Sequence, residues 1–181
     1  GIYTVVAGFV VMLSFLNNSL TTSTQRFITV ALGKGNMAYL NDVYSVSIGI
    51  HVLMALFVLL LGETFGLWYV LTQMVYPPDM LWPVIVCYQC ALGMAMLLIV
   101  SIPYNATIIA YERMTAFAGI TVMDVLLKLG AASALCLFAD GRRLIPYSLL
   151  MLGVATITRI SYSIYCNRAF PHLRFRFCRE S

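Results

Sequence analysis

The sequence predicts an all-α membrane protein, a polytopic bundle of five spanning helices. Of its 181 residues, 61% are hydrophobic and only 10% are charged, and the mean hydropathy is +0.90. Soluble domains average about 25% charged residues. The apolar residues also form continuous blocks, each near the roughly 20 residues with which a helix crosses a bilayer. These blocks cover approximately 2–32, 43–62, 82–103, 114–139 and 144–167.

The blocks and the joints between them favour helices over strands. Membrane strands have about 10 residues of alternating character, whereas these blocks are apolar throughout. In the first joint, Gly33 and Gly35 are helix-stop signals, and Asn41 or Asp42 is the expected cap of the next helix. The second joint, "YPPDMLWP", contains three prolines that break a helix.

The lysines and arginines predict the orientation in the membrane. Seven of them lie in or near the first joint, the third joint and the tail: Arg26, Lys34, Arg113, Arg168, Arg174, Arg176 and Arg179. The other two joints hold only Arg142 and Arg143, together with Glu63, Asp79 and Asp140. Because cytoplasmic loops carry the excess of positive charge, the first set is expected inside the cell.

Aromatic residues and the net charge agree with this orientation. An outer interfacial belt is expected from Trp68, Tyr69, Tyr76 and Trp82. The net charge of +4 reflects the same bias, so we expect no nucleic-acid partner.

The beginning of the chain predicts a fragment. In this orientation the first helix starts outside, and the chain begins with Gly1. The first block has no basic leader and no evident small-residue cleavage site, so it does not resemble a signal peptide. We therefore expect an internal fragment that lacks at least one helix upstream.

An acid and a base lie near the middle of the fourth block. Asp124 and Lys128 are four residues apart, so they share one helix face and can form an ion pair. Each is about 15 Å or more from the nearer helix end, where an ionised side chain costs roughly 2.5 to 3.5 kcal/mol. The pair is therefore expected to face other helices, either as a structural pair or in a transport cavity where Asp124 accepts a proton or sodium ion.

Arg159 is a third intramembrane charge, about 13 Å from the cytoplasmic end of the last block. No acid lies near it in the sequence, and Thr156 and Ser163 flank it on the same helix face. It is either an unpaired cation within a polar stripe or pairs with an acid on another helix, such as Asp124, leaving Lys128 to solvent.

Polar side chains also follow one face of the first block. Their spacing of three or four residues keeps them within about 40° of a common direction over about 22 Å. They are Ser14, Asn18, Thr22, Gln25 and Thr29. Five such residues predict a wetted wall rather than isolated hydrogen bonds between helices. His51 in the second block is either a proton carrier or a packed, hydrogen-bonded side chain.

Motifs for catalysis and metal binding are weak in this sequence. Cys87 and Cys90 form a C-x-x-C, but it begins a spanning helix and lacks the βαβ surroundings of a redox site. The sequence contains no H-E-x-x-H, no G-x-S-x-G and no paired aspartate motif. We therefore expect no enzyme, no catalytic residue, no bound metal and no cofactor. A purely structural scaffold would give no reason for charges at mid-depth.

A family resemblance rests on three long stretches: "GIYTVVAGFVVMLSFLNNSLTTSTQRFITVALGKGN", "VSIPYNATIIAYERMTAFAGITVMDVLLKLG" and "RISYSIYCNRAFPHLRFRF". Together they cover nearly the whole chain and resemble the Wzx-type lipopolysaccharide or oligosaccharide flippases common in Bacteroidetes. These flippases belong to the MATE-like superfamily of multidrug and oligosaccharidyl-lipid exporters. The joint "LGKGN" is similar to the Leu-Gly-x-Gly-Asn/Asp turn after helix two of that superfamily.

The resemblance implies a transporter of two six-helix lobes that rock around a central cavity. The chain would supply five helices of the N-terminal lobe within residues 1–167, and 168–181 would begin a basic cytoplasmic linker. The C-terminal lobe of the same chain would complete the protein. Members of the family carry anionic lipid-linked sugars across the bacterial inner membrane, so the implied partners are that substrate and the bilayer.

The resemblance also implies a cavity for the polar residues identified above. Lys128 and Arg159 match a cationic site for the anionic head group, and Asp124 partly offsets them. Further cavity candidates are Asn18, Thr22, Gln25 and His51. The alternative in the same superfamily is a multidrug or organic-cation exporter, in which Asp124 would matter most and a coupling ion, H+ or Na+, would drive transport.

Overall fold

The computed structural model describes residues 2–72, 81–136, 144–171 and 173. Side chains are described for residues 18–72, 81–134, 145–171 and 173. Within these residues the chain is helical and contains no strand, which confirms the all-α prediction. The elements are α1 (Ile2–Gly33), α2 (Met37–Leu61), η1 (Gly62–Gly66), α3 (Leu67–Thr72), α4 (Leu81–Ala110), α5 (Met114–Cys136) and α6 (Leu144–Ala169).

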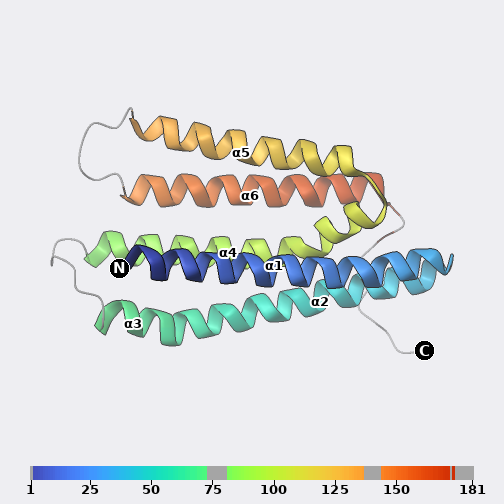
Figure 1. Cartoon of the computed structure of the whole chain (residues 1–181), viewed down its shortest axis with the longest axis horizontal. Helices are drawn as coiled ribbons and strands as arrows, with labels where there is room; N and C mark the ends of the chain where they lie inside the picture. Colours follow the sequence, from blue (N-terminus) through green and yellow to red (C-terminus); the bar gives the residue numbers. More distant parts are fainter. Residues whose placement is uncertain (1, 73–80, 137–143, 172, 174–181) are drawn as a thin grey trace.

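The helices lie lengthwise in one bundle (Figure 1). α4 is the central helix and packs against α6, α1 and α2, whereas α5 packs mainly against α6. The α1–α2 turn, the α4–α5 joint and the end of α6 all lie at one end of the bundle (Figure 1). This end carries Arg26, Lys34, Arg113 and Arg168, and we call it the basic end.

Four helical segments in the described part are long and apolar enough to cross a membrane. They are Met37–Thr72, Leu81–Ala110, Met114–Ala134 and Ile145–Ala169. The prediction of a multi-pass helical membrane protein is therefore supported with four spans. The expected fifth span, 2–32, is helical as α1, but most of its side chains lie outside the described residues.

The outer surface of the bundle matches a lipid environment. Large apolar side chains on α2 and α5 are more than half exposed, among them Leu53 at 69%, Phe57 at 62% and Leu129 at 62%. In water such a surface would drive association, whereas hydrocarbon solvates it. The buried apolar core is concentrated toward the basic end, where Ile28, Leu40, Ile108 and Phe170 from four parts of the chain pack together.

The start of α2 corrects the predicted cap. Asn36, and not Asn41 or Asp42, is the N-cap, because its side-chain oxygen accepts hydrogen bonds from the backbone N–H groups of Ala38 at 3.0 Å and Tyr39 at 3.2 Å. Gly35 before it has φ +65°, a conformation that side chains with a Cβ rarely adopt. A two-residue turn and a cap therefore start the helix six residues before the predicted block at 43.

The predicted end of the second block at residue 62 is also wrong, because the helix continues past it. One turn, η1, is a π-helix, and α3 then carries the helix to Thr72. The Tyr88 hydroxyl of α4 donates a hydrogen bond to the Gly62 carbonyl at 2.7 Å. A Cβ added at Gly66 would overlap this hydroxyl, so the absence of side chains at Gly62 and Gly66 leaves the space that Tyr88 occupies.

The third block likewise ends later than predicted. α4 does not stop at Pro103 but runs to Ala110 with the proline inside it. A proline cannot donate its backbone hydrogen bond and bends a helix, and α4 turns toward α5 in this region (Figure 1). The Thr107 hydroxyl donates to the Pro103 carbonyl at 2.7 Å. Burial of Pro103 among neighbouring helices outweighs the intrinsic cost of the proline.

The fourth and fifth predicted blocks begin where α5 and α6 begin, at residues 114 and 144. The described part of α5 is Met114–Cys136, and the last three residues of the predicted block, 137–139, lie outside the described residues. α6 extends two residues beyond the predicted 167, so the expected linker at 168–181 begins inside a helix. Residues 174–181 lie outside the described part.

The orientation can be tested with single cysteines in a cysteine-free background. Gly35 and Glu112 are exposed turn residues at the basic end. We expect cysteines at these positions to react from the cytoplasm, and cysteines at Asp79 and Gly141, which lie outside the described residues, to react from outside. Reaction of position 35 with an impermeant thiol reagent added outside would reverse the orientation.

Candidate functional site

A polar cavity lies between α4, α5 and α6. Its volume is about 430 Å³, and apolar residues of α4 and α6 form the rest of its wall. The polar lining residues are Ser101, Asn105, Thr121, Asp124, Lys128, Thr158, Arg159 and Tyr162. We call this the charged cavity. It brings together the three intramembrane charges that the sequence singled out, from α5 and α6.

The acid and base of α5 form the expected ion pair. Lys128 Nζ lies 2.7 Å from Asp124 Oδ2, and the side chains of Asp124 and Lys128 are 19% and 51% exposed. The Thr158 hydroxyl of α6 donates to the other carboxylate oxygen of Asp124 at 2.8 Å. Asp124 is therefore satisfied by one cation on its own helix and one hydroxyl on the next.

Arg159 has a different environment from Asp124. Its guanidinium carbon lies 3.9 Å from the centre of the Tyr104 ring, a cation–π contact between α6 and α4. Its Nη1 is buried and has no hydrogen-bond partner among the described residues. The hypothesis that Arg159 pairs with Asp124 is wrong in the described structure, because Lys128 and Thr158 occupy the carboxylate.

Arg159 lies deep in the predicted membrane span, where an ionised side chain is costly. It lies ten residues before Ala169 at the end of α6, which is about 15 Å of helix. Asn105 lines the same cavity, and its Oδ1 is also buried without a partner among the described residues. With one acid, Asp124, and two cations, Lys128 and Arg159, the formal charge of the lining is +1.

Sequence reasoning did not single out Tyr104, which lies against Arg159, nor five polar residues of the lining: Ser101, Asn105, Thr121, Thr158 and Tyr162. Tyr104 and Asn105 follow Pro103, where the predicted helix ended, so they were placed in a joint instead of in α4. Thr158 precedes Arg159, but nothing in a single sequence indicates that its hydroxyl reaches Asp124 on another helix. The sequence signal that could have indicated Tyr104 and Asn105 was a polar Tyr-Asn pair directly after a proline within a helix.

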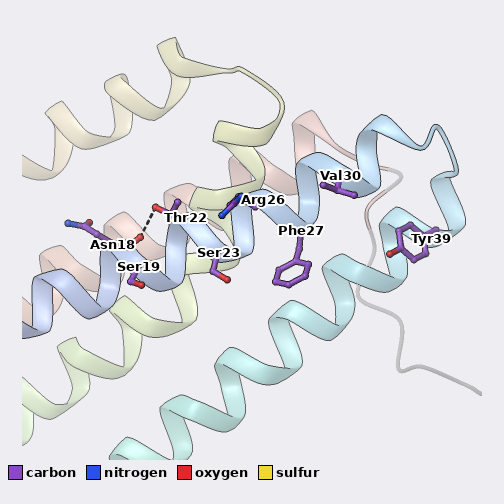
Figure 2. Close-up of a pocket in the computed structure, with 8 residues that line it drawn as sticks. All are labelled: Asn18, Ser19, Thr22, Ser23, Arg26, Phe27, Val30 and Tyr39. Carbon is purple, nitrogen blue, oxygen red and sulfur yellow. Dashed lines mark hydrogen bonds between the residues drawn. The ribbon is translucent and has the colours of Figure 1, made fainter.

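Two residues of the polar stripe of α1, Asn18 and Thr22, line a separate groove (Figure 2). This groove has a volume of about 810 Å³ and is lined by Asn18, Ser19, Thr22, Ser23, Arg26, Phe27, Val30 and Tyr39. We call it the α1 groove. No α5 or α6 residue lines it, and no α1 residue lines the charged cavity. The structure therefore does not bring the stripe and the charges together within the described chain.

The members of the stripe differ in exposure. Asn18, Thr22 and Thr29 are exposed, and the Thr22 hydroxyl donates to the Asn18 carbonyl at 2.9 Å. Gln25 is half-buried and is not part of the groove lining. The side chain of Ser14 lies outside the described residues. Buried residues such as Ala31 occupy the opposite face of α1, so the polar face points away from the bundle core.

His51 lies in neither cavity. It is 4% exposed, and its Nδ1 lies 2.8 Å from the Ser47 carbonyl of the preceding turn. Because a carbonyl only accepts, this contact places a proton on Nδ1. Its Nε2 is buried with no partner among the described residues. The geometry is that of a packed histidine with one unused nitrogen.

The described cysteines and acids form no metal cluster. Cys87, Cys90 and Cys166 are free thiols. In the described ranges no three His, Cys, Asp or Glu side chains lie close enough together to hold a metal ion.

The four long apolar helices of the described chain indicate a multi-pass helical membrane protein. No family model matches the sequence, and no curated protein and no solved structure matches it. Any narrower assignment therefore depends on the chemistry of the cavities.

Proposed function

We propose that this chain is part of a transporter that flips an anionic lipid-linked oligosaccharide across a bacterial inner membrane by alternating access. The observation that carries the proposal is the guanidinium of Arg159 in the charged cavity. It is stacked on Tyr104, it has an unpaired buried Nη1, and no described acid pairs with it.

A cation in this position favours an anionic ligand. Charged side chains inside a membrane are costly and commonly mark ion or substrate pathways. The guanidinium carbon lies 3.9 Å from the centre of the Tyr104 ring, and the buried Nη1 has no partner among the described residues. A guanidinium group can donate two parallel hydrogen bonds to a phosphate. A pyrophosphate has the negative charge and the acceptor oxygens that complement the guanidinium.

The α1 groove supports a sugar-bearing substrate and a larger assembly. Its lining combines one amide, four hydroxyl-bearing residues including Tyr39, two aromatic rings including that of Tyr39, and one arginine. Hydroxyl and amide groups exposed on a spanning helix are poor lipid contacts, so they are expected to face water or protein. In the proposed transporter α1 is a fifth span, and its polar face lines a central cavity that the C-terminal lobe closes.

A second function has one specific observation in its favour. Asp124 lines the same cavity and could accept a proton or a sodium ion, as a cation-coupled exporter of drugs requires. Its carboxylate is already held by Lys128 and Thr158, however, and the lining carries more cations than acids. The anionic substrate is therefore the better fit.

The test is complementation of a flippase-deficient host with the rebuilt full-length protein. We expect Arg159→Lys to retain part of the surface polysaccharide and Arg159→Gln to retain very little. The ammonium group of lysine keeps the positive charge of the guanidinium but not its planar set of donors, and the amide of glutamine has no charge. Amounts are normalised to protein in the membrane. Glu112→Gln, which removes an exposed charge in the α4–α5 joint and lines neither cavity, is the control and should behave like the parent.

The same experiment separates the two functions. Full polysaccharide from well-expressed Arg159→Gln would contradict the anion site and favour the cation exporter. If Arg159→Gln and Arg159→Lys both reduce the amount of protein but not the activity per molecule, Arg159 acts as a brace between α4 and α6.

A further inference from the structure

A second basic cavity lies at the basic end, between α5 and α6. Its volume is about 510 Å³, and it is lined by Arg113, Ile120, Ser161, Ile164, Tyr165, Arg168 and Ala169. It shares no residue with the charged cavity or the α1 groove. We propose that this cavity binds the phosphate head group of an anionic membrane phospholipid, with its acyl chains along α5 and α6.

The charge of the cavity supports an anionic occupant. Arg113 comes from the joint before α5, and Arg168 comes from the last turn of α6, yet both line one cavity. Neither arginine has an ion pair with an acid among the described residues. The guanidinium of Arg113 lies 5.9 Å from the centre of the Phe170 ring, which orients the group without neutralising it.

The remaining lining fits a lipid better than a free anion. Ile120, Ile164 and Ala169 form an apolar wall beside the two arginines, and Ile164 is 47% exposed on the outer surface of α6. The Tyr165 hydroxyl adds a polar group that can donate to a phosphate oxygen. A diacyl phospholipid presents this same order of phosphate and hydrocarbon, and basic pockets between spanning helices are known to suit such head groups.

Location at the helix ends agrees with this occupant. Arg113 and Arg168 lie at the ends of spanning segments, where lipid phosphates lie, rather than at mid-depth as Arg159 does. A general excess of cytoplasmic positive charge would explain two arginines at this end. It would not explain why they line one cavity with an apolar wall.

The experiment uses the full chain purified in a neutral detergent. Binding of dioleoyl phosphatidylglycerol is compared with that of dioleoyl phosphatidylcholine, which has the same acyl chains but no net charge. We expect tighter binding of the phosphatidylglycerol, and a rise in its Kd of about fivefold for each of Arg113→Gln and Arg168→Gln. Arg168→Lys should lose less than Arg168→Gln, and Lys34→Gln at the same end should leave the Kd unchanged.

Three results would overturn the proposal. Unchanged phosphatidylglycerol binding by the folded double variant Arg113→Gln/Arg168→Gln would show that the arginines do not hold the lipid. Equal affinity for phosphatidylcholine would indicate only an apolar groove. If glycerol 3-phosphate alone bound as tightly as the lipid, the site would be one for a free phosphate. Because Arg159 is intact throughout, each result is independent of the proposed transport function.

Discussion

Replacing Asp124 with alanine is expected to lower the free energy of unfolding by about 3 kcal/mol and to reduce the amount of folded protein in the membrane. The change removes the contact of 2.7 Å to Lys128 and the hydrogen bond from Thr158. It leaves an ammonium group near mid-depth, where insertion of an ionised side chain costs roughly 2.5 to 3.5 kcal/mol. Protein abundance in membranes and thermal unfolding in detergent measure the effect.

The double variant is the decisive control for this pair. Asp124→Ala with Lys128→Ala removes both charges, so we expect it to recover much of the loss seen in Asp124→Ala. Asp124→Asn, which keeps an acceptor for Thr158, should fall between them. If Asp124→Ala were as abundant and stable as the parent, the pair would not contribute to folding. If the double variant inserts normally but does not transport, the pair belongs to the transport machinery.

Replacing Gly66 with alanine is expected to lower the free energy of unfolding by about 1–3 kcal/mol. The added Cβ would overlap the Tyr88 hydroxyl and lie 3.0 Å from the ring carbon that bears it. The ring is rigid, so it has to swing away, and this movement breaks the hydrogen bond of 2.7 Å to the Gly62 carbonyl. Thermal unfolding in detergent measures the loss.

Gly49→Ala on the same continuous helix is the matched control. A Cβ at Gly49 has no neighbour within 4 Å, so this change should be neutral or slightly stabilising. Combining Gly66→Ala with Tyr88→Ala removes the overlap, and the added cost of Gly66→Ala should then nearly disappear. If Gly66→Ala were as stable as Gly49→Ala, Tyr88 would not occupy the space between the helices.

Helix content was predictable because it depends on local composition. Continuous apolar blocks of membrane-spanning length, each flanked by polar joints, place the five helical regions of the described chain. The errors at helix ends have a common cause. Pro103 and Gly62 are stop signals for an isolated helix, but in the bundle Pro103 is buried and the Gly62 carbonyl accepts a hydrogen bond from Tyr88. Packing contacts of this kind outweigh local propensity.

The candidate site was predictable only where its contacts are local. Asp124 and Lys128 meet because four residues make about one helical turn, and the sequence alone is sufficient for that geometry. The partners of Arg159 and Asp124 on neighbouring helices were not predictable in the same way. Tyr104 is 55 residues from Arg159, and Thr158 is 34 residues from Asp124, by their positions in the chain.

The sequence by itself determined that this chain is a bundle of apolar helices with charges at mid-depth, because hydrophobicity and the i, i+4 spacing are properties of the chain. Only the tertiary structure decided that Lys128 and Thr158 satisfy Asp124 while Arg159 stacks on Tyr104 with an unpaired nitrogen. It also placed the polar face of α1 apart from those charges. The physical reason is that the rotation of each helix and the continuation of α4 past Pro103 depend on how neighbouring helices pack, and one sequence does not specify that packing locally.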